Sequence, residues 1–208
     1  MDIFCYPFAR GRLFLEQEID KNQYSNAQQC FWASGTALIV RKKLFLESGA
    51  FEEIFFAHME EIDLCWRLQA MGHEIWVEPR SLVYHKNAVS LPMNSHKKYY
   101  LNHRNSLIMI FSNYSILITL YLGSLRLILE LIACMYTLLK LDFNHFTGIV
   151  KSIIWILLHP LQIIKKRSRF KKIKRVSDKK IMRMLTKDSI VLQHYFFRKK
   201  TYLEIVSK

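Results

Sequence analysis

Three carboxylates stand within four residues in the segment 60–63 (EEID). Carboxylates this close repel one another, which can raise the pKa of one of them and make it a better general base. Apolar residues follow at helical spacing, so we predict a helix that begins at this segment and ends before Gly72. A second interpretation stays open. The segment could be a charged first turn, favoured by the helix dipole, in which Asp63 and Arg67 pair four residues apart.

The surrounding sequence predicts short elements that would position the acidic helix. Residues 36–41 (TALIVR) are apolar and partly β-branched, which is typical of a buried strand. Residues 42–48 predict a short helix stopped by a glycine. Residues 74–78 and 81–85 predict two further short strands, separated by Pro79. A partial α/β domain is therefore expected around the acidic segment.

Two other positions near this segment could contact a ligand. Ser34 and Gly35 precede the predicted strand, and glycine permits close backbone approach to a ligand. An ordinary tight turn is an equal alternative. Arg104 lies on a predicted helix that includes Lys97, on the same face as Tyr100. Its guanidinium could hold a diphosphate through two parallel hydrogen bonds. Packing of that helix against the domain is the alternative.

Composition and charge narrow the class of protein. The 208 residues carry a net charge of +14, and residues 165–175 hold eight basic side chains in eleven positions. Such a block suits anionic lipid or nucleic acid. A nucleic-acid site is the weaker hypothesis because Phe170 is the only aromatic residue in the block available for stacking. The four cysteines are scattered, which disfavours a zinc knuckle and favours a reducing compartment.

The segment 114–175 is strongly apolar but interrupted by charge. Residues 116–139 include Arg126 and Glu130, and a charge at the bilayer centre costs roughly 2.5–3.5 kcal/mol. Residues 152–164 form a second apolar run that is short of the about 20 residues a membrane span needs. We therefore expect helices that lie on or dip into the cytoplasmic leaflet. A two-span hairpin that turns near residues 142–146 remains open.

The order of the motifs resembles a known family. Phe31-Trp32-Ala33-Ser34-Gly35 comes first, then Gly49-Ala50-Phe51-Glu52, then the acidic segment, then His85. This order is similar to the second half of the catalytic domain of family 2 glycosyltransferases, which have the GT-A fold. The resemblance covers residues 1–113. It implies a partial GT-A domain there, membrane-associated helices with a basic anchor over 114–175, and a basic, partly helical tail over 176–208.

The resemblance also implies roles for individual residues. It implies transfer of a sugar from a nucleotide-sugar donor to an acceptor hydroxyl with inversion, as in cell-surface polysaccharide synthesis. The expected catalytic residues are Glu61 as general base, with Glu60 and Asp63. The family most often has Asp at the position of Glu61. The expected substrate-binding residues are Trp32, Ser34, Gly35, Arg67 and Arg104, and His85 is the expected ligand of Mg²⁺ or Mn²⁺.

The expected partners follow from the same resemblance. They are the donor, a glycan or lipid-linked acceptor, and an anionic membrane surface on the cytoplasmic face of a bacterial inner membrane, with no nucleic acid. The family's nucleotide-binding half and its Asp-x-Asp motif are not in this sequence. We therefore expect either a truncated product or a separate N-terminal half, and no activity from this chain alone. The alternative is a non-catalytic membrane-associated interaction protein that retains a remnant of the fold.

Overall fold

The computed structural model describes residues 1–84, 92 and 94–206. This part of the chain is mainly helical, with two small antiparallel sheets of two strands each. Strand β1 (Arg12–Leu13) pairs with β2 (Glu16–Gln17), and β3 (Gln28–Cys30) pairs with β4 (Ile75–Val77). The α/β class expected from the sequence is confirmed only in that helices and strands are both present. The GT-A fold stays a prediction.

The helices differ greatly in length. The α-helices are α1 (Lys42–Glu47), α2 (Glu60–Ala70), α3 (His96–Asn113), α4 (Ile116–Leu139), α5 (Phe143–Leu158), α6 (Pro160–Ile173), α7 (Asp178–Met182), α8 (Ile190–Tyr195) and α9 (Tyr202–Val206). Two 3₁₀ turns, η1 (Gly35–Ala37) and η2 (Glu53–Phe55), precede α1 and α2.

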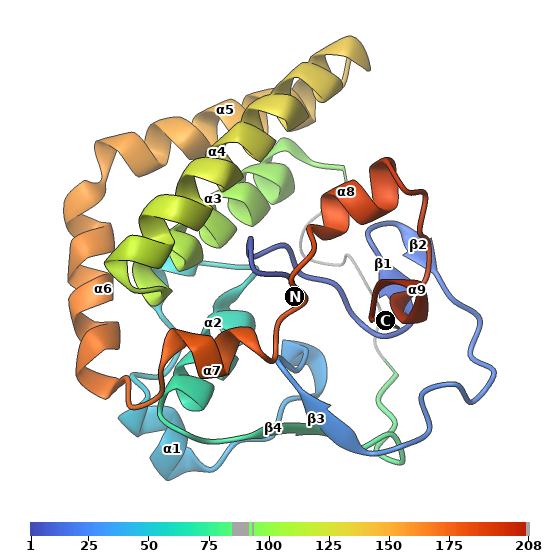
Figure 1. Cartoon of the computed structure of the whole chain (residues 1–208), viewed down its shortest axis with the longest axis vertical. Coiled ribbons are helices and arrows are strands. Elements are labelled where there is room, and N and C mark those ends of the chain that lie inside the picture. Colours follow the sequence, from blue (N-terminus) through green and yellow to red (C-terminus); the bar gives the residue numbers. More distant parts are fainter. Residues whose placement is uncertain (85–91, 93, 207–208) are drawn as a thin grey trace.

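The long helices form one layer, and the acidic helix α2 lies beneath it (Figure 1). Helices α3, α4 and α5 pack on one another, and α3 also contacts α6. The chain bends by 75° between α5 and α6. Pro160 begins α6, where its missing N–H costs no hydrogen bond. After this bend α6 runs down the side of the molecule to α2.

A single hydrophobic cluster joins the three segments predicted from the sequence. It includes Trp66 of α2, Ile108 of α3, Leu122 of α4, Phe170 of α6 and Ile181 of α7. Trp66 is fully buried and meets the rings of Phe31 and Tyr114 edge-on. Because the same cluster draws on residues 1–113, 114–175 and 176–208, these segments share one core.

Most of the predicted elements are confirmed, but the strands predicted at 36–41 and 81–85 are not found among the described residues. The helices expected at 42–48, at the acidic segment and after Lys97 are present, as is a strand within 74–78. Residues 36–41 do not form the predicted buried strand: 35–37 form η1, and Ile39 is 95% exposed. Leu38 and Val40 still pack on a small core cluster. The alternation is therefore kept, but no described strand pairs with this segment. Residues 81–84 are not a strand either.

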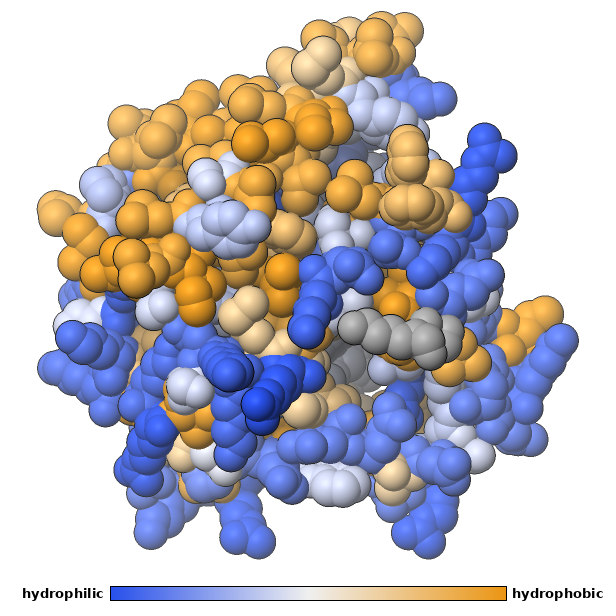
Figure 2. Space-filling view, in the orientation of Figure 1, coloured by the Kyte–Doolittle hydropathy of each residue, from blue (hydrophilic) through white to orange (hydrophobic). Residues whose placement is uncertain are grey.

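The surface is divided into an apolar and a hydrophilic region. Figure 2 shows apolar side chains gathered over the upper part of the molecule, where α4 and α5 lie, and hydrophilic side chains below. The most exposed apolar residues of the two helices are Leu117, Leu120, Tyr121, Met135, Leu139, Leu157 and Leu158. We call this region the apolar face.

Candidate functional site

The acidic helix begins after an unusual backbone turn. Phe56, His58 and Met59 have positive φ angles of 62°, 66° and 71°. This left-handed region is uncommon for residues other than glycine and costs free energy at each position. Such backbone strain persists only where surrounding contacts hold it, and it concentrates at functional sites.

Two neighbouring side chains of α3 hold this turn. Asn105 donates hydrogen bonds to the carbonyl oxygens of Phe55, Ala57 and His58, at 3.0, 2.8 and 2.7 Å. The Nη2 atom of Arg104 donates to the carbonyl oxygens of Ile54 and Phe55, at 2.8 and 2.9 Å. These side-chain N–H groups satisfy backbone carbonyl oxygens that a helix or a strand would pair with backbone N–H groups. Arg104 therefore packs α3 against this turn, which is the predicted alternative to diphosphate binding.

Three buried polar atoms of this segment have no hydrogen-bond partner among the described residues. They are Nε2 of His58, Oε2 of Glu60 and Oε2 of Glu61. Buried polar atoms are nearly always paired, so each exception calls for an explanation such as a ligand or water. Three such exceptions within four residues, on a strained turn, indicate a binding site.

Glu61 is suited to accept a proton near neutral pH. Burial, and then the neighbouring Glu60, raise the pKa of Glu61 from 4.5 to about 7, although backbone N–H groups including that of Gly35 oppose the shift. The repulsion predicted from the sequence is thus present, but burial is the larger cause. Burial, together with Lys98, lowers the pKa of His58, which favours a neutral imidazole. A general base works best when its pKa lies near the working pH.

The predicted Ser34-Gly35 turn lies beside Glu61. A Cβ atom added to Gly35 would lie 3.7 Å from the Cβ atom of Glu61. The Ser34 hydroxyl accepts a hydrogen bond from the N–H of Thr36 at 3.4 Å and so begins η1. A mainly apolar cleft of about 370 Å³ opens next to Gly35. Trp32 is half-buried and packs against both core clusters that flank α2.

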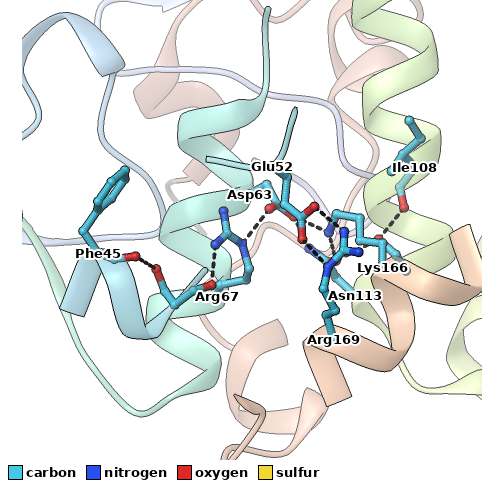
Figure 3. Close-up of polar contacts among 10 residues, drawn as sticks. Phe45, Glu52, Asp63, Arg67, Ile108, Asn113, Lys166 and Arg169 are labelled. Carbon is cyan, nitrogen blue, oxygen red and sulfur yellow. Dashed lines mark hydrogen bonds and ion pairs between the residues drawn. The ribbon is translucent and has the colours of Figure 1, made fainter. Parts of the chain in front are cut away.

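Asp63 and Arg67 lie inside the protein (Figure 3). Asp63 Oδ2 accepts from Arg67 Nε at 2.7 Å, and its Oδ1 accepts from Lys166 Nζ at 2.7 Å and from Asn113 Nδ2 at 3.0 Å. Arg67 also donates to the carbonyl oxygen of Ser48. Burial alone would raise the pKa of Asp63, but Lys166 and Arg67 together lower it. Asp63 and Arg67 are 0% and 2% exposed, and Nη2 of Arg67 has no hydrogen-bond partner among the described residues. The pair braces α2 from inside, and the catalytic role of Asp63 and the substrate-binding role of Arg67 stay predictions.

The predicted metal site is not assembled by the described residues. Within residues 1–84, 92 and 94–206, no three His, Cys, Asp or Glu side chains lie close enough to hold a metal ion. His85, the predicted ligand, lies outside the described residues. The divalent cation therefore remains a prediction from the sequence.

No sequence pattern points to Lys166 or Asn113. Lys166 is one of eight basic residues in the block 165–175, yet it is 1% exposed and bound to Asp63. Asn113 is the last residue of α3 and bridges the same two side chains. Only the packing of α6 on α2 and α3 distinguishes Lys166 from its exposed neighbour Lys165 and brings Asn113 to it.

A comparison with known proteins finds two curated relatives. A stretch of 56 residues is 38% identical to the N-acetylglucosaminyl-diphospho-decaprenol L-rhamnosyltransferase of Mycobacterium tuberculosis strain CDC 1551 / Oshkosh, and to the protein of that name in strain ATCC 25618 / H37Rv. The match covers 26% of this chain and 18% of each relative. No family model and no solved structure matches the chain. The match supports a relationship to glycosyltransferases.

Proposed function

We propose that this chain is the acceptor-side part of a glycosyltransferase that works at a membrane surface. It would transfer a sugar from a nucleotide-sugar donor to the hydroxyl of a glycan or lipid-linked acceptor, with inversion, in cell-surface polysaccharide synthesis. The observation that carries the proposal is the trio of unpartnered buried atoms on His58, Glu60 and Glu61. The partial match to a rhamnosyltransferase agrees with it.

The chemistry assigned to Glu61 is general-base catalysis. Its carboxylate removes the proton of the acceptor hydroxyl as that oxygen bonds to the anomeric carbon. The bond from this carbon to the nucleotide diphosphate breaks on the opposite face, and the diphosphate leaves with the electron pair. Glu60 has the second unpartnered oxygen, and the proposal assigns it to binding the acceptor. Mg²⁺ or Mn²⁺, with His85 as a ligand, stays part of the proposal and would neutralise the leaving diphosphate.

The proposed membrane partner rests on how α4 is packed. By length and composition α4 is the one described helix able to cross a membrane unaided. Its two charged residues are buried, with Arg126 donating to Glu130 at 2.5 and 2.8 Å. Arg126 also donates to Ser106 of α3 and to the carbonyl oxygen of Phe4. The middle of α4 is bonded to Phe4 and Ser106, so α4 could reach the bilayer centre only if these residues entered the bilayer with it. We therefore propose that α4 lies in the membrane plane.

The bent pair of α5 and α6 also supports a position on the membrane surface. Together the two helices are long and apolar enough to cross a membrane. The buried charge on α6 is Lys166, which is bonded to Asp63 of α2. Each candidate span is thus tied by a buried ion to the part of the chain that holds the acidic helix. The exposed basic side chains of α6, which are Lys165, Lys171 and Lys172, suit anionic lipid.

The C-terminal tail places aromatic and basic side chains next to α4, which belongs to the apolar face. Tyr195 of α8 packs on Tyr136 of α4, with ring centroids 5.6 Å apart. Phe196 and Phe197 follow, 76% and 61% exposed, and Arg198-Lys199-Lys200 come directly after them. Aromatic rings beside basic side chains are favoured at a membrane interface. The tail, for which the sequence suggested no role, is therefore proposed as an anchor.

Sugar transfer tests the proposal directly. The chain, in nanodiscs that contain anionic lipid, is incubated with labelled nucleotide sugars, lipid-linked acceptors and Mn²⁺, with and without a separately expressed nucleotide-binding half. We expect transfer when that half is present, and a loss of at least 100-fold in Glu61→Gln, of the order that general bases contribute. Glu16→Gln, at an exposed position on β2, is the matched control.

Two results would count against this function. Equal transfer by Glu61→Gln and the parent chain would remove Glu61 from the reaction. No transfer and no donor binding with either set of components would favour the alternative, a non-catalytic membrane-associated interaction protein.

A further inference from the structure

A second cleft lies between the start of α3 and the middle of α5. It has a volume of about 440 Å³ and is lined by Phe56, His96, Lys97, Tyr100, Arg104 and Lys151, with Leu101. Three of these side chains are cations, and none of the lining residues is a carboxylate. Resting on the proposed function, we propose that this cleft binds the phosphate or diphosphate head group of a membrane lipid that carries the acceptor.

The two lysines of the cleft are held by aromatic rings. The Lys97 ammonium lies 4.6 Å from the centroid of the Phe56 ring, and the Lys151 ammonium lies 5.1 Å from that of Tyr100. Neither forms an ion pair with a carboxylate in the described part of the chain. Contacts between a cation and an aromatic ring are weak at exposed sites, whereas charge-assisted hydrogen bonds to phosphate are strong. Both ammonium groups are therefore available to an anion.

Arg104 places a fixed positive charge in the wall of the same cleft. Its guanidinium is buried, donates to backbone carbonyls and Asn105, and lies over the rings of Tyr100 and Trp155. All these partners are neutral, and no carboxylate in residues 1–84, 92 and 94–206 pairs with it. A buried charge without a counter-charge is costly. An anion in the cleft would supply that counter-charge without displacing the turn that Arg104 holds.

The surface of α5 indicates that the anion is part of a lipid. Ile154 and Leu158 stand three and seven residues after Lys151, so they share its face of the helix. Ile154 is 48% exposed, and Leu158, which belongs to the apolar face, is 71% exposed. An apolar stripe thus leads away from the Lys151 ammonium. A soluble nucleotide has nothing to place there, whereas a lipid phosphate has a hydrocarbon chain.

The cleft adjoins the strained turn of the candidate site. Phe56 lines the cleft and has one of the three positive φ angles before α2. Arg104 bonds to the carbonyl oxygens of Ile54 and Phe55 in that same turn. A head group bound in the cleft would therefore present its attached sugar on the side of the chain where Glu60 and Glu61 begin their helix.

Binding to lipid nanodiscs tests this inference without any sugar transfer. The full chain is titrated with zwitterionic nanodiscs that contain a few mole per cent of a polyprenyl diphosphate, and with nanodiscs matched in charge by phosphatidylglycerol. We expect at least tenfold tighter binding to the polyprenyl diphosphate, about the gain of one charge-assisted hydrogen bond. The double variant Lys97→Gln/Lys151→Gln should lose this preference. The control Lys171→Gln/Lys172→Gln, at two exposed positions of α6, should weaken binding to both nanodiscs equally.

Three outcomes would overturn the inference. They are equal binding to the two nanodiscs, an undiminished preference in the Lys97/Lys151 variant with unchanged circular dichroism, and competition by soluble nucleoside diphosphate as effective as that by the lipid. The last would make the cleft a nucleotide site. Because the readout is binding, the inference can fail while Glu61 remains essential for transfer, and the reverse also holds.

Discussion

Lys166 Nζ lies 2.7 Å from Asp63 Oδ1, and this contact joins the basic block of α6 to the acidic segment of α2 (Figure 3). The two residues are 103 positions apart in the chain. Both side chains are almost fully buried. The pair fixes the helix that presents Glu60 and Glu61 against the layer of long helices, so stability and site geometry depend on the same contact.

Asp63→Ala is expected to lower the free energy of unfolding by about 3–5 kcal/mol, because it leaves Lys166 and Arg67 buried without their counter-charge. Urea unfolding of the detergent-solubilised chain measures the change. Since the folded pKa of Asp63 is lowered, its contribution is present above the unfolded pKa and is lost as the pH falls through the folded value. The matched control is Glu52→Gln. Its partner Arg169 is about half-exposed, so a loss within about 1 kcal/mol is expected.

Glu61→Gln should remove a pH dependence of stability. Because the folded pKa of Glu61 is raised from 4.5 to about 7, the folded chain binds more protons between these values, and the free energy of unfolding falls as the pH rises. A shift of this size corresponds to at most about 3 kcal/mol. The variant should therefore be more stable than the parent above pH 7. Urea titrations from pH 4.5 to 8.5 would show it. An unchanged difference across that range would mean that Glu61 does not titrate there.

Asn105→Ala should loosen the turn before α2, since three backbone carbonyl oxygens lose their donor. We expect a loss of about 1–3 kcal/mol, and faster hydrogen exchange and proteolysis confined to residues 52–61. Asn102→Ala is the control on the same helix. Asn102 makes no side-chain hydrogen bond within the part of the chain that the structure describes. Uniformly faster exchange over the whole chain would argue against a local role for Asn105.

Phe196→Ser/Phe197→Ser should weaken binding to anionic liposomes by at least about tenfold, because two exposed rings leave the proposed interface. Co-sedimentation at rising salt measures the effect. Ile39→Ser is the control, since Ile39 is 95% exposed but precedes α1, at the other end of the molecule from the apolar face (Figure 1). Equal weakening by both variants would show that exposed apolar area alone, and not the tail, decides binding.

The sequence predicts those elements whose signals lie within a single segment. The acidic helix ends where Gly72, with φ of +98°, stops it, and the i,i+4 pair of Arg126 and Glu130 forms as its spacing predicts. Ile39 shows the limit. Its segment keeps the alternation of a strand, but whether a strand forms depends on a partner that a single segment cannot specify.

Long-range contacts account for what the sequence did not reveal. Nothing near Lys166 distinguishes it from Lys165, which is exposed, until α6 packs against α2. The charges of α4 argued against a simple span, but their partners at Phe4 and Ser106 are visible only in the fold. The sequence predicts that Arg104 could bind a diphosphate. The structure shows that it also donates a hydrogen bond to the carbonyl oxygen of Phe55 and so holds the turn.

The 75° bend at His159 and Pro160 fixes how far residues of α6 lie from the apolar face. One arm, α5, belongs to the apolar face, and the other, α6, leaves it at a steep angle. Lys166 stands six residues after Pro160, which corresponds to about 9 Å along a helix that rises about 1.5 Å per residue. If the apolar face rests on lipid, Lys166 lies about this far below the bend, beside the Asp63 side chain that α3 also holds through Asn113. Inserting one helical turn into α6 before Lys166 would carry Lys166 about 5 Å past Asp63 and break their contact, because α2 stays bound to α3.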